Sequence, residues 1–257
     1  MTKQNKNHPQ DKLNMKILTI ILEYCKIKKG DFMEKFTGLI VATDEEKQTI
    51  EEVMNNKAKK IVNGLEFLQG DIELKHYCLV QCGVGKVNAA RTTQVLIDYF
   101  DIQEVINLGV AGGLSNNLNI GDIVIGKELI QHDFDITAFG HEKGYITQIG
   151  KIFKSDKELI EKCEKIKIKG INIITGNIAS GDIFCTDKKM KEKIHSKFQA
   201  DCVEMEGAAV AQVCFLNNIP FVVIRAISDI PNGNNQIDYN IFVRKAAQNC
   251  AEFIKKL

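Results

Sequence analysis

From residue 37 onward, the chain alternates between two patterns of apolar and polar positions. Short runs that are almost wholly apolar predict strands buried on both faces. Longer stretches with apolar residues three or four positions apart predict helices with one buried side. Strands are predicted at 37–42, 104–108, 122–125, 171–179 and 221–227, a hairpin-like pair at 61–68 and 72–82, and helices after Thr43, Lys86, Ser155, Thr186 and Glu206 and from 239 to 255. This alternation predicts an α/β fold: a three-layer αβα sandwich around a mixed, mostly parallel sheet.

The residues at several predicted element ends add detail. Thr43 precedes Glu46 by three positions, which predicts a capping box at the start of a helix. Ser155 begins a second pattern of the same kind, and Thr186 is expected to cap a later helix. The glycine-rich segment 109–113 follows a predicted strand and favours a tight turn there.

Residues 37–257 show no internal boundary and are predicted to form a single domain. Residues 1–36 carry more lysines than acids and no clean period, which predicts an N-terminal extension that is peripheral or unstructured. Within it, the apolar run 17–22 follows two lysines as in a signal peptide, but it is at or below the short end of the roughly 7–15 residues that such a segment needs. We therefore expect a cytoplasmic protein with an extension, or a reading frame that starts near Met33. Lipid-anchored export through Cys25 is the alternative.

Composition and charge narrow the class of protein. The 257-residue chain is 44% apolar and 26% charged, which is typical of a globular protein. Its 34 basic and 33 acidic side chains leave a formal net charge of +1, which gives no sign of nucleic acid or an anionic membrane as a partner. No apolar run approaches the roughly 18 residues of a membrane-spanning helix. The eight cysteines are scattered without metal-ligand spacing, which favours buried thiols in a reducing cytoplasm and no metal.

Polar residues gather where the predicted strands end, which is where open α/β sheets bind their ligands. The candidates are Asp44, Glu45 and Glu46, the segment 109–113, Ser180 and Asp182, Glu204 and Glu206, and Arg225, Ser228 and Asp229. Acids from several strand ends predict one site rich in carboxylates. Each also has a structural explanation, since Glu46 completes a capping box, Glu206 lies at a helix start and Ser228-Asp229 can cap a turn.

Five motifs follow one another in a specific order: GVGK at 83–86, GVAGGL at 109–114, SGD at 180–182, VEME at 203–206 and RAISD at 225–229. With these motifs and HDFDITAFG at 132–140, residues 37–257 resemble the bacterial 5′-methylthioadenosine/S-adenosylhomocysteine nucleosidases of the nucleoside phosphorylase superfamily. The resemblance implies hydrolysis of the N-glycosidic bond of 5′-methylthioadenosine, S-adenosylhomocysteine and 5′-deoxyadenosine. The products are adenine and the 5′-substituted ribose, as in methionine salvage, and no cofactor is expected.

The resemblance also implies catalytic roles for two acids. Asp229, in RAISD, is expected to protonate adenine N7, so burial or a neighbouring acid should keep it protonated near neutral pH, with Ser228 orienting it. Glu46, in the first strand-to-helix turn, is expected to activate the attacking water. The helix start should lower the pKa of Glu46 and keep it ionised, and Arg225 is expected to hold the water or Glu46.

The resemblance further implies a set of substrate-binding residues: Val110, Phe139, Phe184, Cys185, Glu204, Met205, Glu206, Arg225, Ser228 and Phe242. Glu206 is expected to bind the ribose hydroxyls above Met205. Phe184, the backbone of Cys185 and Phe242 would form the adenine pocket. Phe139 is expected to cover the 5′-thio group from the partner subunit of a homodimer. Val110 stands where many members have serine, so a possible hydroxyl contact is lost, and Thr43 stands where methionine is frequent.

Three other functions stay open. A purine nucleoside phosphorylase needs cations for phosphate, but the chain has only three arginines, none in 109–113, and Glu46 would repel the anion. A nucleosidase for a related adenine nucleoside, such as aminodeoxyfutalosine, differs only in its substrate. A substrate with a 5′-phosphate would need a cationic pocket, whereas Phe139 predicts an apolar one. A nucleoside-binding module without catalysis is a third possibility, against which the presence of both Glu46 and Asp229 argues.

Overall fold

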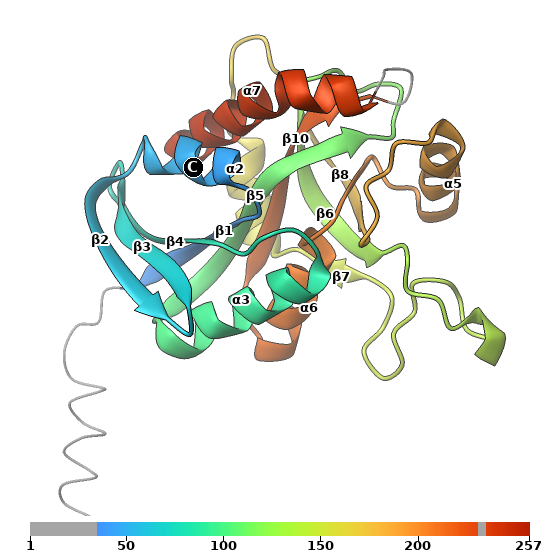
Figure 1. Cartoon of the computed structure of the whole chain (residues 1–257), viewed down its shortest axis with the longest axis horizontal. Helices are drawn as coiled ribbons and strands as arrows, with labels where there is room; N and C mark the ends of the chain where they lie inside the picture. The colour runs from blue at the N-terminus through green and yellow to red at the C-terminus, as the bar shows by residue number, and fades with distance from the viewer. Residues whose placement is uncertain (1–34, 231–234) are drawn as a thin grey trace, which may run out of the picture. The chain divides into compact units, whose positions relative to one another are not determined.

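A computed structural model of the chain describes residues 35–230 and 235–257, and of residues 235–240 it describes the backbone alone (Figure 1). The first elements are β1 (Phe36–Val41), α2 (Asp44–Glu51), β2 (Asn55–Val62), β3 (Leu65–Ile72), β4 (Lys75–Gln81), α3 (Lys86–Tyr99), β5 (Ile102–Gly113), β6 (Ile123–Gln131) and the 3₁₀ turn η1 (Thr137–Phe139). They are followed by β7 (Phe153–Lys154), α4 (Lys157–Glu164), β8 (Ile173–Ser180), α5 (Lys188–Phe198), β9 (Cys202–Glu204), α6 (Gly207–Asn217), β10 (Phe221–Asp229) and α7 (Asn235–Lys256). Lys35–Leu257 form one compact unit, and the predicted division of the chain into an extension and a domain from residue 37 stays a prediction.

The strands form one sheet, part of which closes on itself. The order is β10-β6-β8-β9-β5-β1-β4-β3-β2, and β7 pairs with β6. Because β10 also pairs with β5, the strands β10, β6, β8, β9 and β5 make a closed ring, from which β1, β4, β3 and β2 extend. The register places Asp229 beside Gly112, Gly112 beside Val203, and Glu204 beside Ser180. Ring closure therefore brings together the ends of β5, β8, β9 and β10.

The α/β class is as predicted, but the sheet is neither a simple middle layer nor mostly parallel. Of the ten strand pairings in the described residues, five are parallel and five antiparallel. The predicted hairpin at 61–68 and 72–82 is a three-stranded meander, β2-β3-β4. Its first turn is Asn63-Gly64, whose φ angles of 50° and 77° suit a two-residue hairpin turn, in the middle of what was predicted as one strand.

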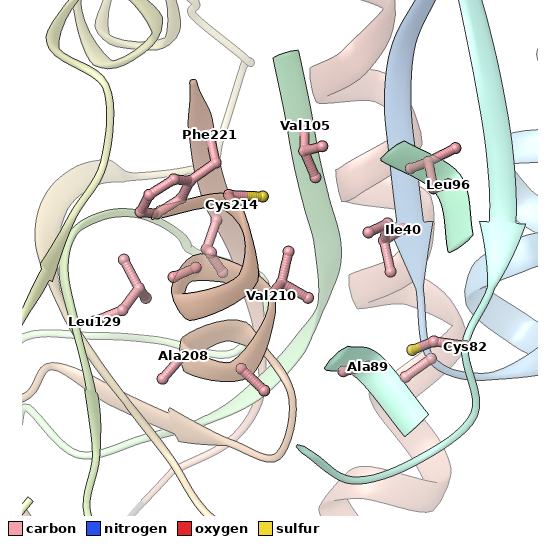
Figure 2. Packing of buried hydrophobic residues seen from close by; sticks show 14 of the residues in the cluster. Ile40, Cys82, Ala89, Leu96, Val105, Leu129, Ala208, Val210, Cys214 and Phe221 are labelled. Atoms are coloured by element: carbon pink, nitrogen blue, oxygen red, sulfur yellow. The ribbon is translucent and has the colours of Figure 1, made fainter. Parts of the chain in front are cut away.

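Two apolar clusters occupy opposite faces of the sheet around β1. Ile40 belongs to the cluster that includes Val105 and Val210 and is covered by α3 and α6, as Figure 2 shows. Leu39 and Val41 belong to the other cluster, on the side of α2 and α7 (Figure 1). Since successive side chains of a strand point to opposite faces, a strand covered by helices on both sides is apolar throughout.

The helix starts show one prediction confirmed and two that were wrong by one residue. Thr43 caps α2, and both hydrogen bonds of the predicted capping box are present. In α4 the cap is Asp156 rather than Ser155, and in α5 it is Asp187 rather than Thr186. In each pair the carboxylate, a strong acceptor that also interacts favourably with the helix dipole, accepts the backbone N–H. The last helix begins at Asn235, earlier than the predicted 239.

Several predictions concern residues that the structure does not describe. The expectations for residues 1–34, including the run 17–22, Met33 and Cys25, lie outside the described residues. The other seven cysteines are buried free thiols, as predicted. Within the described ranges, no helix combines the length and apolar character needed to cross a membrane.

Candidate active site

A cavity of about 290 Å³ opens where the strand ends converge. Its walls come from the start of α2, the end of β5, the segment before α5, the turn between β9 and α6, and the end of β10. The lining residues are Ala42, Thr43, Glu46, Val84, Val110, Ala111, Gly112, Ile183, Phe184, Cys185, Val203, Glu204, Met205, Glu206, Ser228 and Asp229. It therefore combines apolar walls with several acids, a composition typical of a small-molecule site.

Glu46 is fixed by backbone N–H groups from two elements. Its Oε2 accepts hydrogen bonds from Ala42 N at 2.8 Å and Thr43 N at 3.1 Å, and its Oε1 accepts one from Val110 N at 2.9 Å. Burial is the largest influence on its pKa and raises it above the ordinary value, although the Arg225 charge and these N–H donors act in the other direction. The prediction that the helix start lowers this pKa is therefore wrong. A raised pKa suits a group that accepts a proton near neutral pH.

The glycine-rich segment is the last part of β5, and the predicted tight turn there is wrong. A Cβ at Gly109 would lie 2.8 Å from Oε1 of Glu46, and a Cβ at Gly112 would lie 3.0 Å from Oδ2 of Asp229. Glycine is needed at these positions because the two carboxylates approach the strand closely. The segment thus allows the acids from α2 and β10 to reach one cavity.

Glu204 and Arg225 form a buried ion pair behind the cavity. The guanidinium donates to Oε2 of Glu204 through Nε at 3.2 Å and Nη2 at 2.5 Å, and also to the side chain and carbonyl of Asn107. Ser180 Oγ donates to the other carboxylate oxygen of Glu204. Burial acts against the charged form, but Arg225 and Ser180 outweigh it and hold the pKa of Glu204 below its usual range. Among the described residues Arg225 thus donates to Glu204 rather than to Glu46, and its predicted contact with the attacking water stays a prediction.

Glu206 is a second acid on the cavity whose pKa is raised. It begins α6, and its Oε1 accepts a hydrogen bond from Gly85 N, at the start of α3, at 2.8 Å. Burial and then the charge of Glu204 raise its pKa to about 8. At neutral pH it is mostly protonated, so its carboxyl group can both donate and accept hydrogen bonds.

Asp229 forms an ion pair with a residue that sequence reasoning missed. Its Oδ2 lies 2.5 Å from Nζ of Lys191, and both side chains are almost completely buried, at 4% and 1% exposure. Its Oδ1 accepts a hydrogen bond from Ser228 Oγ at 2.9 Å, in line with the orienting role expected for that serine. Burial is as expected for Asp229, but its neighbour here is a cation rather than the second acid that was considered.

Nine of the twelve predicted site residues line the cavity: Glu46, Val110, Phe184, Cys185, Glu204, Met205, Glu206, Ser228 and Asp229. Arg225 lies behind them and acts through Glu204. Phe139 is 81% exposed on η1, and Phe242 is partly buried in α7; neither belongs to the lining. The structure of a single chain therefore does not bring these two aromatic residues to the cavity.

The position of Lys191 was detectable in the sequence, though faintly. Helix α5 contains Ile194 three positions later and Phe198 seven positions later, so Lys191 lies on their face of the helix. Five lysines in 188–197 concealed this, since such a run usually indicates an exposed face. Asn107, which orients Arg225, lies within an apolar strand and gave no comparable signal.

The arrangement brings carboxyl groups from several elements to one small cavity. Glu46 comes from α2 and Asp229 from β10, with Glu206 between β9 and α6. Within the described residues, no group of three or more His, Cys, Asp and Glu side chains is placed to hold a metal ion. Protein carboxyl groups are thus available for general acid–base chemistry.

Comparison with known proteins relates the whole described unit to one family. A family model for the phosphorylase superfamily matches residues 37–257. The 5′-methylthioadenosine/S-adenosylhomocysteine nucleosidase of Psychromonas ingrahamii is 40% identical over 224 residues, which is 86% of this chain and 96% of that protein. The Neisseria meningitidis nucleosidase of the same name, solved with methylthio-immucillin-A, has a TM-score of 0.83 at 36% identity, covering 86% of this chain and 97% of its own. A futalosine hydrolase of Helicobacter pylori has a TM-score of 0.83 at 34% identity, covering 87% and 97%.

Proposed function

Because the chain belongs to the phosphorylase superfamily, we propose that it is a nucleosidase that hydrolyses the N-glycosidic bond of 5′-methylthioadenosine and S-adenosylhomocysteine, and also of 5′-deoxyadenosine. The observation that carries the proposal is the placement of Glu46 and Asp229, both buried, on one cavity whose described lining contains no lysine or arginine. Relatives at about 40% identity carry this activity in their names.

In the proposed reaction, water attacks C1′ of the ribose while the bond from C1′ to N9 of adenine breaks. Asp229 donates a proton to N7, so that adenine leaves as a neutral base, and Glu46 takes a proton from the attacking water. General acid–base catalysis of this kind contributes on the order of 10²–10⁴ in rate for each group. Asp229 then takes up a proton from solvent, and Glu46 releases its proton to solvent.

The remaining lining residues suit the parts of an adenine nucleoside. Glu206 would bind the ribose hydroxyls, which both donate and accept hydrogen bonds, as does its protonated carboxyl group. Met205 would pack below the ribose, with Val110 beside it. Phe184, which is 46% exposed in the empty site, would stack on adenine beside the backbone of Cys185.

We further propose a homodimer in which Phe139 covers the 5′-thio group in the partner's site. Phe139 is 81% exposed and lies outside the cavity of its own chain. A large aromatic side chain is enriched at interfaces because it buries much apolar area. Phe242 would complete the adenine pocket by a shift of α7. The buried free thiols support a reducing compartment, the cytoplasm, where methionine salvage would use this reaction.

Adenine release from 5′-methylthioadenosine tests the function. We expect release in phosphate-free buffer, unchanged when phosphate is added, with free methylthioribose as the second product. Release that requires phosphate and yields a sugar 1-phosphate would identify a phosphorylase instead. Since a futalosine hydrolase has the same fold, aminodeoxyfutalosine should be assayed in parallel to rank the substrates.

A further inference from the structure

Lys191 contacts Asp229 from outside the lining of the cavity, and the proposed reaction does not use it. It projects from α5 and is 1% exposed, and its Nζ lies 2.5 Å from Oδ2 of Asp229. A Cβ at Gly112 would lie 3.1 Å from this Nζ, so the absence of a side chain on β5 makes room for the pair. A lysine is almost never so fully buried without a specific partner, and here one partner is the proposed acid.

Both oxygens of Asp229 are bound by donors in this structure. Lys191 donates to Oδ2 and Ser228 donates to Oδ1. Two donors suit an ionised carboxylate, which only accepts hydrogen bonds, whereas a general acid must carry a proton and point it at the base. With both oxygens bound in this way, proton donation to the base requires one of the two contacts to change.

Ser228 is able to change partner without leaving its place. Its Oγ lies 3.3 Å from the carbonyl oxygen of Ala111, a second acceptor for the same hydroxyl hydrogen. Lys191 has only donor hydrogens, so its ammonium group cannot accept a proton from a protonated Asp229. The contact between Lys191 and Oδ2 is thus the one that competes with the base.

We propose that Lys191 is a positioning residue: its ammonium group holds Oδ2 of Asp229 until the adenine base takes that oxygen, and so controls proton donation to the base. This inference rests on the proposed function. Because the ammonium group competes with the base for this oxygen, removing it should change how proton donation depends on pH.

Other charged and titratable groups also lie in or behind this part of the cavity wall. They are Glu46 on α2, Glu204 at the end of β9, Glu206 before α6, Arg225 on β10, and Cys185 and Asp187 before α5. Arg225 is paired with Glu204, and Glu46 is bound by backbone N–H groups. Lys191 is the only cation in direct contact with Asp229 among the described residues.

The test is the pH dependence of hydrolysis by Lys191→Met. In this variant the alkaline fall in kcat/KM, which reports the free enzyme, should move up by about one to three pH units. The alkaline fall in kcat should move less, because the substrate complex has already displaced Lys191. Lys191→Arg, which keeps the charge, should retain the wild-type profile, as should Lys193→Met, an exposed control on the same helix. A folded Lys191→Met enzyme with an unchanged kcat/KM profile would overturn the inference.

Adenine binding separates this inference from the proposed function. Affinity for adenine is measured by calorimetry at a series of pH values. The pH at which this affinity falls should be higher for Lys191→Met than for wild type, whether or not methylthioadenosine is hydrolysed. If Lys191→Met does not fold, a crystal structure of the wild-type adenine complex decides. We expect the Lys191 Nζ beyond hydrogen-bonding distance of the oxygen that faces N7; the contact preserved at 2.5 Å would refute the proposal.

Discussion

At the scale of single residues, Asp229 is both the proposed acid and the partner of a buried cation. Asp229→Asn should reduce kcat by about 10²–10⁴ because the amide cannot donate the proton. It should also lower stability by about 3–5 kcal/mol, because the buried ion pair between Lys191 and Asp229 is broken. Adenine release measures the first effect and chemical denaturation the second, and calorimetry with methylthioadenosine checks that the variant still binds substrate.

A double variant separates chemistry from stability. Adding Lys191→Met to Asp229→Asn replaces both members of the buried ion pair, so stability should return toward wild type while hydrolysis stays low. Hydrolysis that survives in the stable double variant would exclude Asp229 as the acid.

Glu206 makes a prediction about stability and pH. Its ordinary pKa of 4.5 is raised to about 8 in the folded protein, so between these values the folded protein keeps a proton that the unfolded chain has released. The stability that this proton contributes is fully present below about pH 4.5 and is lost as pH rises through about 8. Glu206→Gln imitates the protonated form, so the Tm of the variant minus the Tm of wild type should increase as pH rises. Exposed Glu158→Gln is the control, and parallel Tm curves for Glu206→Gln and wild type would contradict the prediction.

The residue scale also shows how far sequence reasoning reaches into a site. The carboxylates at strand ends and the ordered motifs placed nine of twelve residues on the cavity. The pKa of Glu46 was predicted in the wrong direction because local position, a helix start, was weighed without burial, which only the packed structure supplies. Lys191 was missed because its partner lies 38 positions away in the chain.

At the scale of elements, the start of α2 connects stability to the site. Thr43 accepts a hydrogen bond from Glu46 N, while Glu46 accepts one from Thr43 N, so one capping box positions the proposed base. Thr43→Ala should lower the free energy of unfolding by about 1 kcal/mol and also reduce hydrolysis, since the turn that holds Glu46 loosens. Thr43→Ser should restore both.

The cap of α4 is the matched control for this element. Asp156 accepts a backbone hydrogen bond in the same way, but α4 contributes no residue to the described cavity lining. Asp156→Ala should therefore cost similar stability and leave hydrolysis unchanged. An equal loss of hydrolysis in both variants would show that the effect of Thr43→Ala is general destabilisation.

Element types were predicted better than their ends. Strands buried on both faces have a continuous apolar signal, which located β1 and β10 within two residues. The end of β5 was placed too early because glycine favours turns locally, whereas here it makes room for carboxylates from other elements. The same limit applies to the caps of α4 and α5, where two adjacent residues can both cap and the path of the entering chain selects one.

At the scale of the whole molecule, local patterns in the sequence could not predict the order of the strands in the sheet. The pairing of β10 with β5 closes the ring, and no periodicity in either strand encodes the identity of its neighbour. Closure nevertheless determines the site, because it sets Asp229 beside Gly112 and, through β9, near Glu204. The helix and strand inventory follows from the sequence, whereas the convergence of the acids follows from tertiary pairing.

The assembly proposed for the chain makes the last prediction. Phe139, 81% exposed on η1, is expected to enter the partner's site in a homodimer and to contact the 5′-substituent rather than the reacting bond. Phe139→Ala should therefore raise KM for methylthioadenosine more than it lowers kcat, since lost apolar contact weakens binding of substrate and transition state alike. Leu74→Ala, at an apolar residue that is 98% exposed in the turn between β3 and β4, should change neither constant. For the wild type and both variants, light scattering should give twice the mass of one chain. If Phe139 also stabilises the dimer, Phe139→Ala should dissociate into monomers and lose affinity for methylthioadenosine at the same time. A monomeric wild-type enzyme with full activity would remove Phe139 from the site, because its own chain keeps that side chain outside the cavity.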